Sequence, residues 1–183
     1  MSGENLNDLV VSTAQQDEEA FLEEHRYPFL IRERTTGNVP IPGSGQRSTA
    51  RLTRAALPAA GDGFMEAEVT FFRVFPRRED AESVVIGREE AGTDIVIADG
   101  SISAQHAELS LEFSDDDEKL FFLSDLDSAN GTFVNGERLA AGERRQLDDM
   151  DSIRLGPVVK LQFFGPSGFF DFLSMYRRIR RPS

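Results

Sequence analysis

The stretch Val-Val-Ile-Gly-Arg (84–88) opens the part of the chain that decides its fold, and Ile-Arg-Leu-Gly (153–156) closes it. Three further motifs lie between them: Asp-Ile-Val-Ile (94–97), Ser-Ile-Ser-Ala-Gln-His (101–106) and Asn-Gly-Thr-Phe-Val-Asn-Gly (130–136). Short β-type runs alternate here with Gly, Asn, Asp and Ser. Because all-β scaffolds carry their recognition residues on the loops between strands, this order predicts a binding surface rather than a catalytic centre.

Alternating apolar and polar residues extend this pattern. The alternation predicts ten strands, at residues 67–75, 83–88, 94–97, 106–114, 120–126, 133–134, 138–139, 144–147, 152–155 and 158–164. Short strands at regular spacing, with turn residues between them, are typical of a β-sandwich. We therefore predict an all-β fold, a sandwich of about ten to eleven short strands that occupies residues 66–164.

The flanking segments have a different composition. An amphipathic helix is predicted over residues 5–25, within an N-terminal helical segment 1–31, and Tyr27-Pro28 ends it because the residue before proline disfavours helix. Residues 32–65 are rich in Gly, Pro, Ser and Thr and are expected to form a flexible linker. Residues 165–183 predict a short C-terminal helix that is basic in its last turn. We expect the first helix to pack on its own domain or on a partner, and the second to dock against the sandwich.

The composition excludes several classes of function. The chain has no cysteine and two histidines, so disulfides, a thiolate nucleophile and a zinc site are not expected. The net charge is -12, and residues 66–164 carry ten Lys and Arg against 22 Asp and Glu, which argues against nucleic-acid binding. Neither a membrane span nor a secretion signal is apparent, so we expect a cytoplasmic protein. No cofactor is expected.

The loops carry side chains suited to an anion. Arg88 follows Gly87, where the backbone can turn sharply or approach a ligand closely, and an arginine suits bidentate contact with a phosphate. Ser103 adds a hydroxyl donor. His106 opens the next strand and is interpreted as a structural histidine, because no oxyanion arrangement supports a Ser103–His106 nucleophile pair. The run Asp115-Asp116-Asp117-Glu118 is interpreted as a solvated hairpin tip rather than a metal site.

Two asparagines sit in the last of these motifs. Asn130 precedes Gly131 and Asn135 precedes Gly136. Their amides can clamp a peptide backbone through a paired donor and acceptor, although Asn-Gly by itself indicates only a tight turn. In this order and spacing, the separate motifs form a far more specific pattern than any one of them.

Taken together, the motifs resemble the forkhead-associated (FHA) domain, a phosphothreonine-binding β-sandwich, over residues of about 66–164. The resemblance implies that Arg88 and Ser103 hold the phosphate and that Asn130 bonds the peptide main chain. It implies that Ala129 lines the pocket for the residues after the phosphothreonine. Structural support of the site would come from Gly87, His106, Gly131 and Asn135.

Two positions depart from the family pattern. Ala104 stands where many members carry a side-chain donor to the phosphate. Only its backbone N–H remains as a donor, so the free energy of phosphate binding should weaken by about 1–2 kcal/mol. Met150 stands where a turn glycine usually precedes Asp151. If that position needs a positive φ, methionine costs about 1 kcal/mol locally.

The sequence leaves three functional hypotheses. The first is a non-catalytic module that binds phosphothreonine proteins or peptides in Ser/Thr protein kinase signalling. The second is a scaffold or assembly subunit that uses the sandwich and its flanking helices without phosphate, motivated by Ala104 and the acidic charge. The third is a switch in which a phosphorylated linker threonine binds Arg88 in cis, with four candidates: Thr35, Thr36, Thr49 and Thr53. An enzyme is not expected.

Overall fold

The structure is a computed structural model of the chain, and it describes residues 4–34, 68–75 and 83–180. The predicted linker, with its four threonines, lies outside the described residues except at 32–34. Its flexibility and the cis switch therefore stay predictions, as does the division of the chain into four parts.

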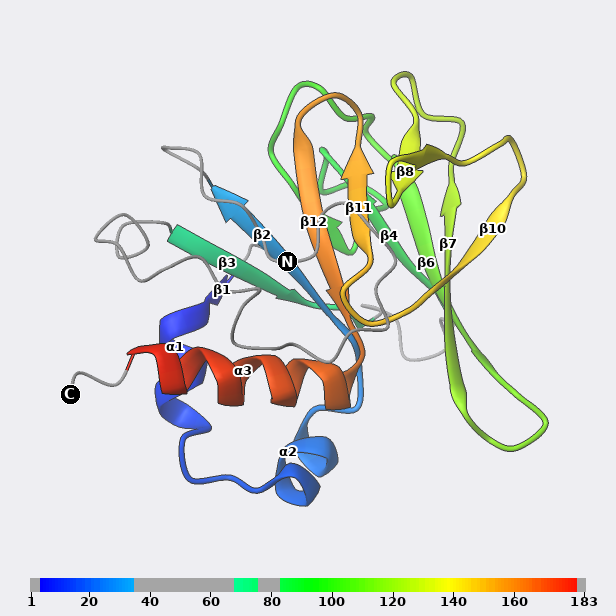
Figure 1. Cartoon of the computed structure of the whole chain (residues 1–183). Helices are drawn as coiled ribbons and strands as arrows, with labels where there is room; N and C mark the ends of the chain where they lie inside the picture. The colour runs from blue at the N-terminus through cyan, green and yellow to red at the C-terminus, as the bar shows by residue number, and fades with distance from the viewer. Residues whose placement is uncertain (1–3, 35–67, 76–82, 181–183) are drawn as a thin grey trace.

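Two β-sheets form a sandwich (Figure 1). The seven-stranded sheet has the order β1 (Glu4–Asn5), β3 (Glu68–Arg73), β2 (Phe29–Arg34), β12 (Val159–Phe164), β11 (Ser152–Leu155), β8 (Thr132–Val134) and β9 (Glu137–Arg138). The five-stranded sheet has the order β10 (Arg144–Leu147), β7 (Lys119–Asp125), β6 (Ala107–Phe113), β4 (Ser83–Gly87) and β5 (Ile95–Val96). The predicted sandwich is confirmed, and each of the ten predicted strands is present with ends shifted by at most two residues.

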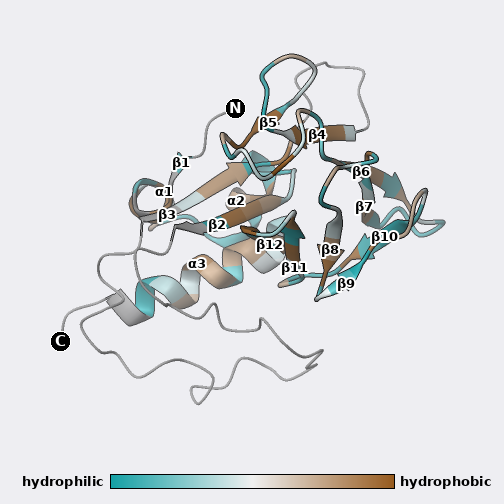
Figure 2. Ribbon diagram, turned by 90° about the horizontal axis from the view of Figure 1, so that it is seen from above, coloured by the Kyte–Doolittle hydropathy of each residue, from teal (hydrophilic) through white to brown (hydrophobic). Residues whose placement is uncertain are grey.

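The seven-stranded sheet is buried on both faces where β2, β3 and β12 lie. Leu30, Phe72 and Phe163 point into the core between the sheets. Their sequence neighbours point to the opposite face, because successive side chains in a strand alternate. There Phe29, Ile31, Phe71 and Phe164 join a second core with the helices. Figure 2 shows hydrophobic segments within β2 and β3, in contrast to the hydrophilic strands β9 and β10.

Strand β2 was not predicted, because its first residues are buried on two faces and show no alternation. It pairs with β12 on one side and with β3 on the other. In the β2–β3 pair Arg34 is opposite Glu68, so residues 35–67 connect two neighbouring antiparallel strands. Residues 29–34, assigned from the sequence to the helical segment and the linker, are therefore part of the sheet. The two-residue β1 was also missed.

The single helix predicted over 5–25 is wrong, since the structure has two. Helix α1 spans Leu6–Ser12 and α2 spans Glu18–Glu24. Asp17 restarts the helix as an N-cap, accepting a hydrogen bond from Ala20 N at 3.0 Å. The predicted C-terminal helix is confirmed as α3, Pro166–Arg180. No helix among the described residues is long and apolar enough to cross a membrane.

The three helices gather beside β1, β2 and β3, away from β6, β7 and β10 (Figure 1). Their apolar side chains fill the second core, which is mainly aromatic. Phe169 of α3 is fully buried and stacks on Phe29, with the two ring centroids 3.9 Å apart. The ring centroid of Phe21 of α2 lies 6.5 Å from that of Phe169. The helices therefore use their apolar faces inside the molecule, as expected for helices that pack on their own domain.

Met150 has the positive φ that the family pattern suggested, at 71°. Its backbone N–H donates to Phe163 O at 2.8 Å, which ties the turn to β12. The side chain is half-buried against the second core. Methionine in this region costs about 1 kcal/mol relative to glycine, which the packing of its side chain offsets in part.

We predict that Phe169→Ala lowers the free energy of unfolding by about 3–5 kcal/mol, because it leaves a cavity in the second core. Urea denaturation followed by circular dichroism measures the change. The control is Phe113→Ala, because Phe113 is 61% exposed and its loss should change stability by less than about 0.5 kcal/mol. Equal effects of the two substitutions would show that α3 is not part of a packed core.

Candidate functional site

The first element of the site is the sharp turn at the end of β4. A Cβ on Gly87 would lie 2.0 Å from Ala104 O, so no larger residue fits there. This close approach lets the backbone N–H of Arg88 donate to Ser103 O at 3.0 Å and Ala104 O at 3.1 Å. The predicted anion-binding residues Arg88 and Ser103 are thus neighbours held by backbone hydrogen bonds.

The Arg88 side chain is at the surface, 41% exposed. Its Nη2 lies 3.2 Å from Glu89 Oε1. An exposed ion pair of this kind contributes about 0–1 kcal/mol, whereas a charge-assisted hydrogen bond contributes about 1.5–3 kcal/mol. The ion pair with Glu89 therefore holds the Arg88 guanidinium only weakly, and an anion that binds the guanidinium more tightly can displace the carboxylate.

His106 joins two loops from a fully buried position. Its Nδ1 accepts from Ser103 N at 3.0 Å, so the ring proton belongs on Nε2, which donates to Gly131 O at 3.2 Å. Burial lowers the pKa of His106, and this outweighs the opposing influence of Gly131 O and the Asp125 carboxylate. The imidazole is therefore neutral, and its two hydrogen bonds join the two loops.

The loop at 126–131 is held against the Ser103 loop by two more hydrogen bonds. Ala129 N donates to Ser103 Oγ at 3.1 Å, and Asn130 Nδ2 donates to Ser101 O at 2.9 Å. Since a carbonyl can only accept, this bond fixes which end of the Asn130 amide is nitrogen. Asn130 Oδ1 makes no hydrogen bond within the described residues and is available to a donor on a ligand.

An acidic anchor under this loop was not predicted. Asp125 accepts hydrogen bonds from Ser128 N at 2.9 Å, Ser128 Oγ at 2.7 Å and Thr132 Oγ1 at 2.6 Å. Burial raises the pKa of Asp125, but the three bonds outweigh it, and the net pKa is lowered. The signal was present in Asp-Leu-Asp-Ser (125–128), because Asp and Ser favour bonds to local backbone.

Two glycines complete the backbone of the site. Gly131 has φ of +80°, and a Cβ there would meet the Arg138 guanidinium at 2.6 Å. Gly156 has φ of +59°, and a Cβ there would lie 2.7 Å from Ser101 O. Gly156 N donates to Gly131 O at 2.9 Å. Gly156 was noted in the motifs but not among the site residues, although it borders both Ser101 and Asn130.

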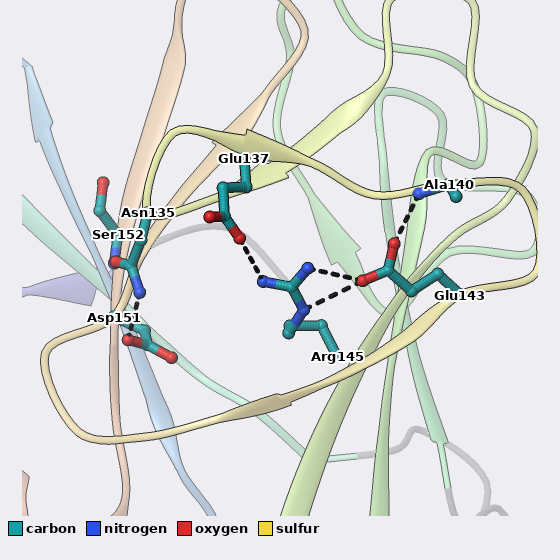
Figure 3. A network of polar contacts seen from close by, with 7 residues as sticks. All are labelled: Asn135, Glu137, Ala140, Glu143, Arg145, Asp151 and Ser152. Carbon is teal, nitrogen blue, oxygen red and sulfur yellow. Dashed lines mark hydrogen bonds and ion pairs between the residues drawn. The ribbon is translucent and has the colours of Figure 1, made fainter. Parts of the chain in front are cut away.

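Asn135 supports a neighbouring turn rather than facing a ligand. It adopts φ of 52° between β8 and β9, and its side chain donates to Asp151 Oδ1 at 2.7 Å and accepts from Ser152 N at 3.0 Å. Both ends of the amide are thus used within the chain (Figure 3). The hypothesis that this amide clamps a peptide is not supported by the geometry, whereas a structural place for it is.

A charged network holds the adjoining β9–β10 segment. Arg145 bonds Glu137 Oε2 at 3.0 Å and Glu143 Oε1 at 2.6 Å, and Glu143 also accepts from Ala140 N at 2.8 Å (Figure 3). The bonds from Ala140 N–H and Arg145 lower the pKa of Glu143. A hollow of about 520 Å³ lies beside this segment and has Ser128 and Arg138 in its walls. Its lining does not include Arg88 or Ser103.

Ala104 contributes backbone rather than side chain. Its carbonyl accepts from Arg88 N and, at 3.3 Å, from Thr93 Oγ1, so the residue helps to fix the turn. Its methyl group offers no donor.

Elsewhere, the described residues contain no group of three or more His, Asp or Glu placed to hold a metal ion. The acidic tip forms a turn in which Ser114 Oγ accepts from Asp116 N and Glu118 N.

The β-sandwich thus carries Arg88, Ser103 and Asn130 on loops that hydrogen bonds hold together. The family model of the FHA domain matches residues 84–156, which span all five motifs. Residues 84–156, which are less than half of the chain, are therefore similar to an FHA domain.

Similarity to curated proteins is confined to part of their length. A mouse (Mus musculus) transcription factor 19-like protein is 38% identical over 81 residues, which are 44% of this chain and 29% of the mouse protein. Formin-J of Dictyostelium discoideum is 56% identical over 36 residues, which are 20% of this chain and 1% of that protein. The matched segment thus spans less than a third of the length of either relative.

Solved FHA domains are similar in structure. The MEK1 FHA domain, in complex with a phosphothreonine peptide of HOP1, is 26% identical over 52% of this chain and 87% of that chain, with a TM-score of 0.44. The yeast Dun1 FHA domain, in complex with a doubly phosphorylated peptide derived from Rad53, is 22% identical over 77% of this chain and 76% of that chain, with a TM-score of 0.49.

We predict that Gly87→Ala destabilises the protein by about 1–3 kcal/mol, because its Cβ must push Ala104 away. Gly100→Ala is the matched control, since a Cβ at Gly100 would meet nothing within 4 Å. Chemical denaturation of both variants measures the difference. Unchanged stability in Gly87→Ala would contradict the close approach of the two loops.

We predict that the free energy of unfolding falls as the pH is lowered from about 7.5 to about 5. Burial lowers the pKa of His106, and burial together with the Arg73 charge lowers the pKa of His25. The unfolded chain therefore takes up protons first, below about pH 6.5, at up to about 1.4 kcal/mol per pH unit for each histidine. Urea titrations at successive pH values measure the slope.

His106→Gln should lose its share of this slope. Asp149, whose pKa is raised by burial, acts in the opposite sense and is tested separately with Asp149→Asn. A stability that stays constant or rises between about pH 7.5 and about pH 5 would contradict the neutral, buried state of His106 and His25.

Proposed function

We propose that this protein binds phosphothreonine-containing proteins or peptides through Arg88, Ser103 and Asn130. The FHA resemblance supplies the ligand class. The single observation that carries the proposal is the backbone turn that holds Arg88, whose side chain is exposed, next to Ser103: Arg88 N donates to both Ser103 O and Ala104 O.

The phosphate is expected to occupy the space between Arg88 and Ser103. Arginine presents a planar fork of donors that matches phosphate oxygens, and the phosphothreonine carries nearly two negative charges at neutral pH. Ser103 Oγ accepts from Ala129 N, which leaves its own proton available to a phosphate oxygen. Ala104 adds no side-chain donor, so the site depends more heavily on Arg88 than a site with a second basic residue would.

The peptide main chain is expected to run along the loop at 126–131. Asn130 Oδ1 is the accepting end of an amide whose other end is fixed on Ser101 O. It suits a backbone N–H of the peptide near the phosphothreonine. Ala129 is exposed next to it and offers a small apolar contact to the residues that follow.

The proposed ligand implies a Ser/Thr protein kinase, because a kinase must phosphorylate the threonine. We propose that the protein is a non-catalytic cytoplasmic module whose partners are kinase substrates or a Ser/Thr protein kinase itself. Binding energy and specificity on this surface come from placed donors, since the net charge of -12 repels anions at long range.

A phosphate-independent scaffold is the second candidate. Ala104 and the acidic charge still favour it, but the helices no longer do. Phe21, Phe169 and Leu173 are buried inside the chain and are not free to dock a partner. A scaffold would therefore have to use the strand and loop surfaces or the exposed outer faces of the helices.

We predict that Arg88→Ala weakens the binding of phosphothreonine peptides about tenfold or more, because a charge-assisted contact is lost. Fluorescence polarisation with labelled peptides selected from a phosphothreonine library measures the affinity. Arg88→Lys should be intermediate, since it keeps the charge but loses the bidentate geometry.

Two controls accompany this measurement. Arg178→Ala removes the same charge from an exposed position on α3, and the unphosphorylated peptide removes the phosphate. The proposal expects wild-type affinity for the first and no measurable binding for the second. Equal affinity of Arg88→Ala and the wild type for the phosphorylated peptide would reject the proposal and leave the scaffold.

A further inference from the structure

Arg32 reaches the site from outside the segment that matches the FHA family model. It lies on β2, the strand that the sequence did not reveal, and pairs in register with Thr70 of β3. Its Nη2 lies 3.4 Å from Asp99 Oδ2. Asp99 belongs to the same loop as Ser103. The position of β2 in the seven-stranded sheet thus brings a cation to the rear of the candidate binding loop.

Asp99 organises that loop through its other carboxylate oxygen. Oδ1 accepts from Ser101 Oγ at 2.6 Å and from Ser101 N at 3.0 Å. Ile102 N donates to Asp99 O at 3.3 Å, and Ile102 is buried beneath the loop. Both oxygens of the carboxylate are therefore used, one by Ser101 and one by Arg32.

Ser101 in turn holds the residue expected to bind the peptide. Its carbonyl accepts from Asn130 Nδ2 at 2.9 Å, and a Cβ on Gly156 would come within 2.7 Å of the same oxygen. Little space remains for Ser101 O to move toward Gly156. A shift of Ser101 would turn the Asn130 amide away from the orientation in which Oδ1 is open to a ligand.

The Arg32–Asp99 pair differs from an ordinary surface pair in its burial. The two side chains are 16% and 24% exposed, so water screens them less than it screens Arg88 and Glu89. The bonds from Ser101 lower the pKa of Asp99, and the Arg32 charge acts in the same direction. Asp99 is therefore ionised at neutral pH, and the removal of Arg32 would leave a partly buried carboxylate without its counter-charge.

We propose that Arg32 is a positioning residue for phosphopeptide binding, which orients Asn130 through Asp99 and Ser101. The inference rests on the proposed function and deepens it, because it makes the N-terminal part of the chain necessary for full affinity. Arg32 itself does not touch the ligand.

The test compares full-length variants in the peptide-binding assay. Arg32→Gln is expected to weaken phosphothreonine-peptide binding about two- to tenfold, the range for residues that act through a contact network. Arg32→Lys should recover part of the loss, because it restores the charge facing Asp99. Arg26→Gln removes an equal charge from an exposed position away from this loop and should bind like the wild type.

A double-mutant cycle identifies the route. In an Asn130→Ala background, Arg32→Gln should cause little further loss, because the group that it positions is absent. The second readout is the side-chain amide resonance of Asn130 in the ligand-free protein. It should shift in Arg32→Gln and stay in place in Arg26→Gln.

The outcomes separate this inference from the proposed function. If the wild type binds the phosphothreonine peptide and Arg32→Gln binds it with the same affinity, the inference is overturned, whereas the proposed function is not. Additive losses in the cycle would also overturn it, since Arg32 would then act by another route. If the wild type binds no phosphothreonine peptide, the proposed function fails, and with it the claim about affinity. An unmoved Asn130 resonance in Arg32→Gln would reject the positioning contact independently of any ligand.

Discussion

The candidate binding surface depends on the pair of hydrogen bonds that the neutral imidazole of His106 makes. His106 accepts from Ser103 N through Nδ1 and donates to Gly131 O through Nε2, and so joins the two loops that carry the site. It can do this only while it is uncharged, because a protonated ring has no acceptor. Its complete burial maintains that state. Two further contacts, Ala129 N to Ser103 Oγ and Asn130 Nδ2 to Ser101 O, each join a side chain at the rim to the backbone of the facing loop.

Charged side chains are placed differently at the rim of the candidate site and behind its loops. The chain is strongly acidic, yet the surface beside Ser103 presents Arg88, whose partner Glu89 is exposed and weakly held. The carboxylates of Asp125 and Asp99 lie behind the loops and bond to Ser, Thr and backbone donors. Negative charge is thus used to shape the loops, while the exposed Arg88 side chain can meet an anion.

The sequence predicted most of the sandwich, because strands such as β6 and β7 alternate between a buried and a solvated face. It failed at β2, where Phe29, Leu30 and Ile31 are all buried between two cores and the alternation disappears. It also merged α1 and α2, since the apolar stripe continues across the cap at Asp17. In the site, family motifs led to Arg88, Ser103, His106 and Asn130. Arg32 has no such motif, because its importance arises from a contact with Asp99, a residue far from it in the sequence. Asp99 and Asp125 bond to nearby serines, a local pattern that is common in turns and does not by itself mark a site.

The most direct test of this account is the ³¹P resonance of a bound phosphothreonine peptide, followed as the pH is varied. If the Arg88 guanidinium contacts the phosphate, it favours the dianion and lowers the second phosphate pKa below the value of the free peptide, which is about 6. We therefore expect the bound resonance to titrate at lower pH than the free one. A bound peptide whose phosphate titrates at the same pH as in solution would contradict the account, because its phosphate would not lie against Arg88.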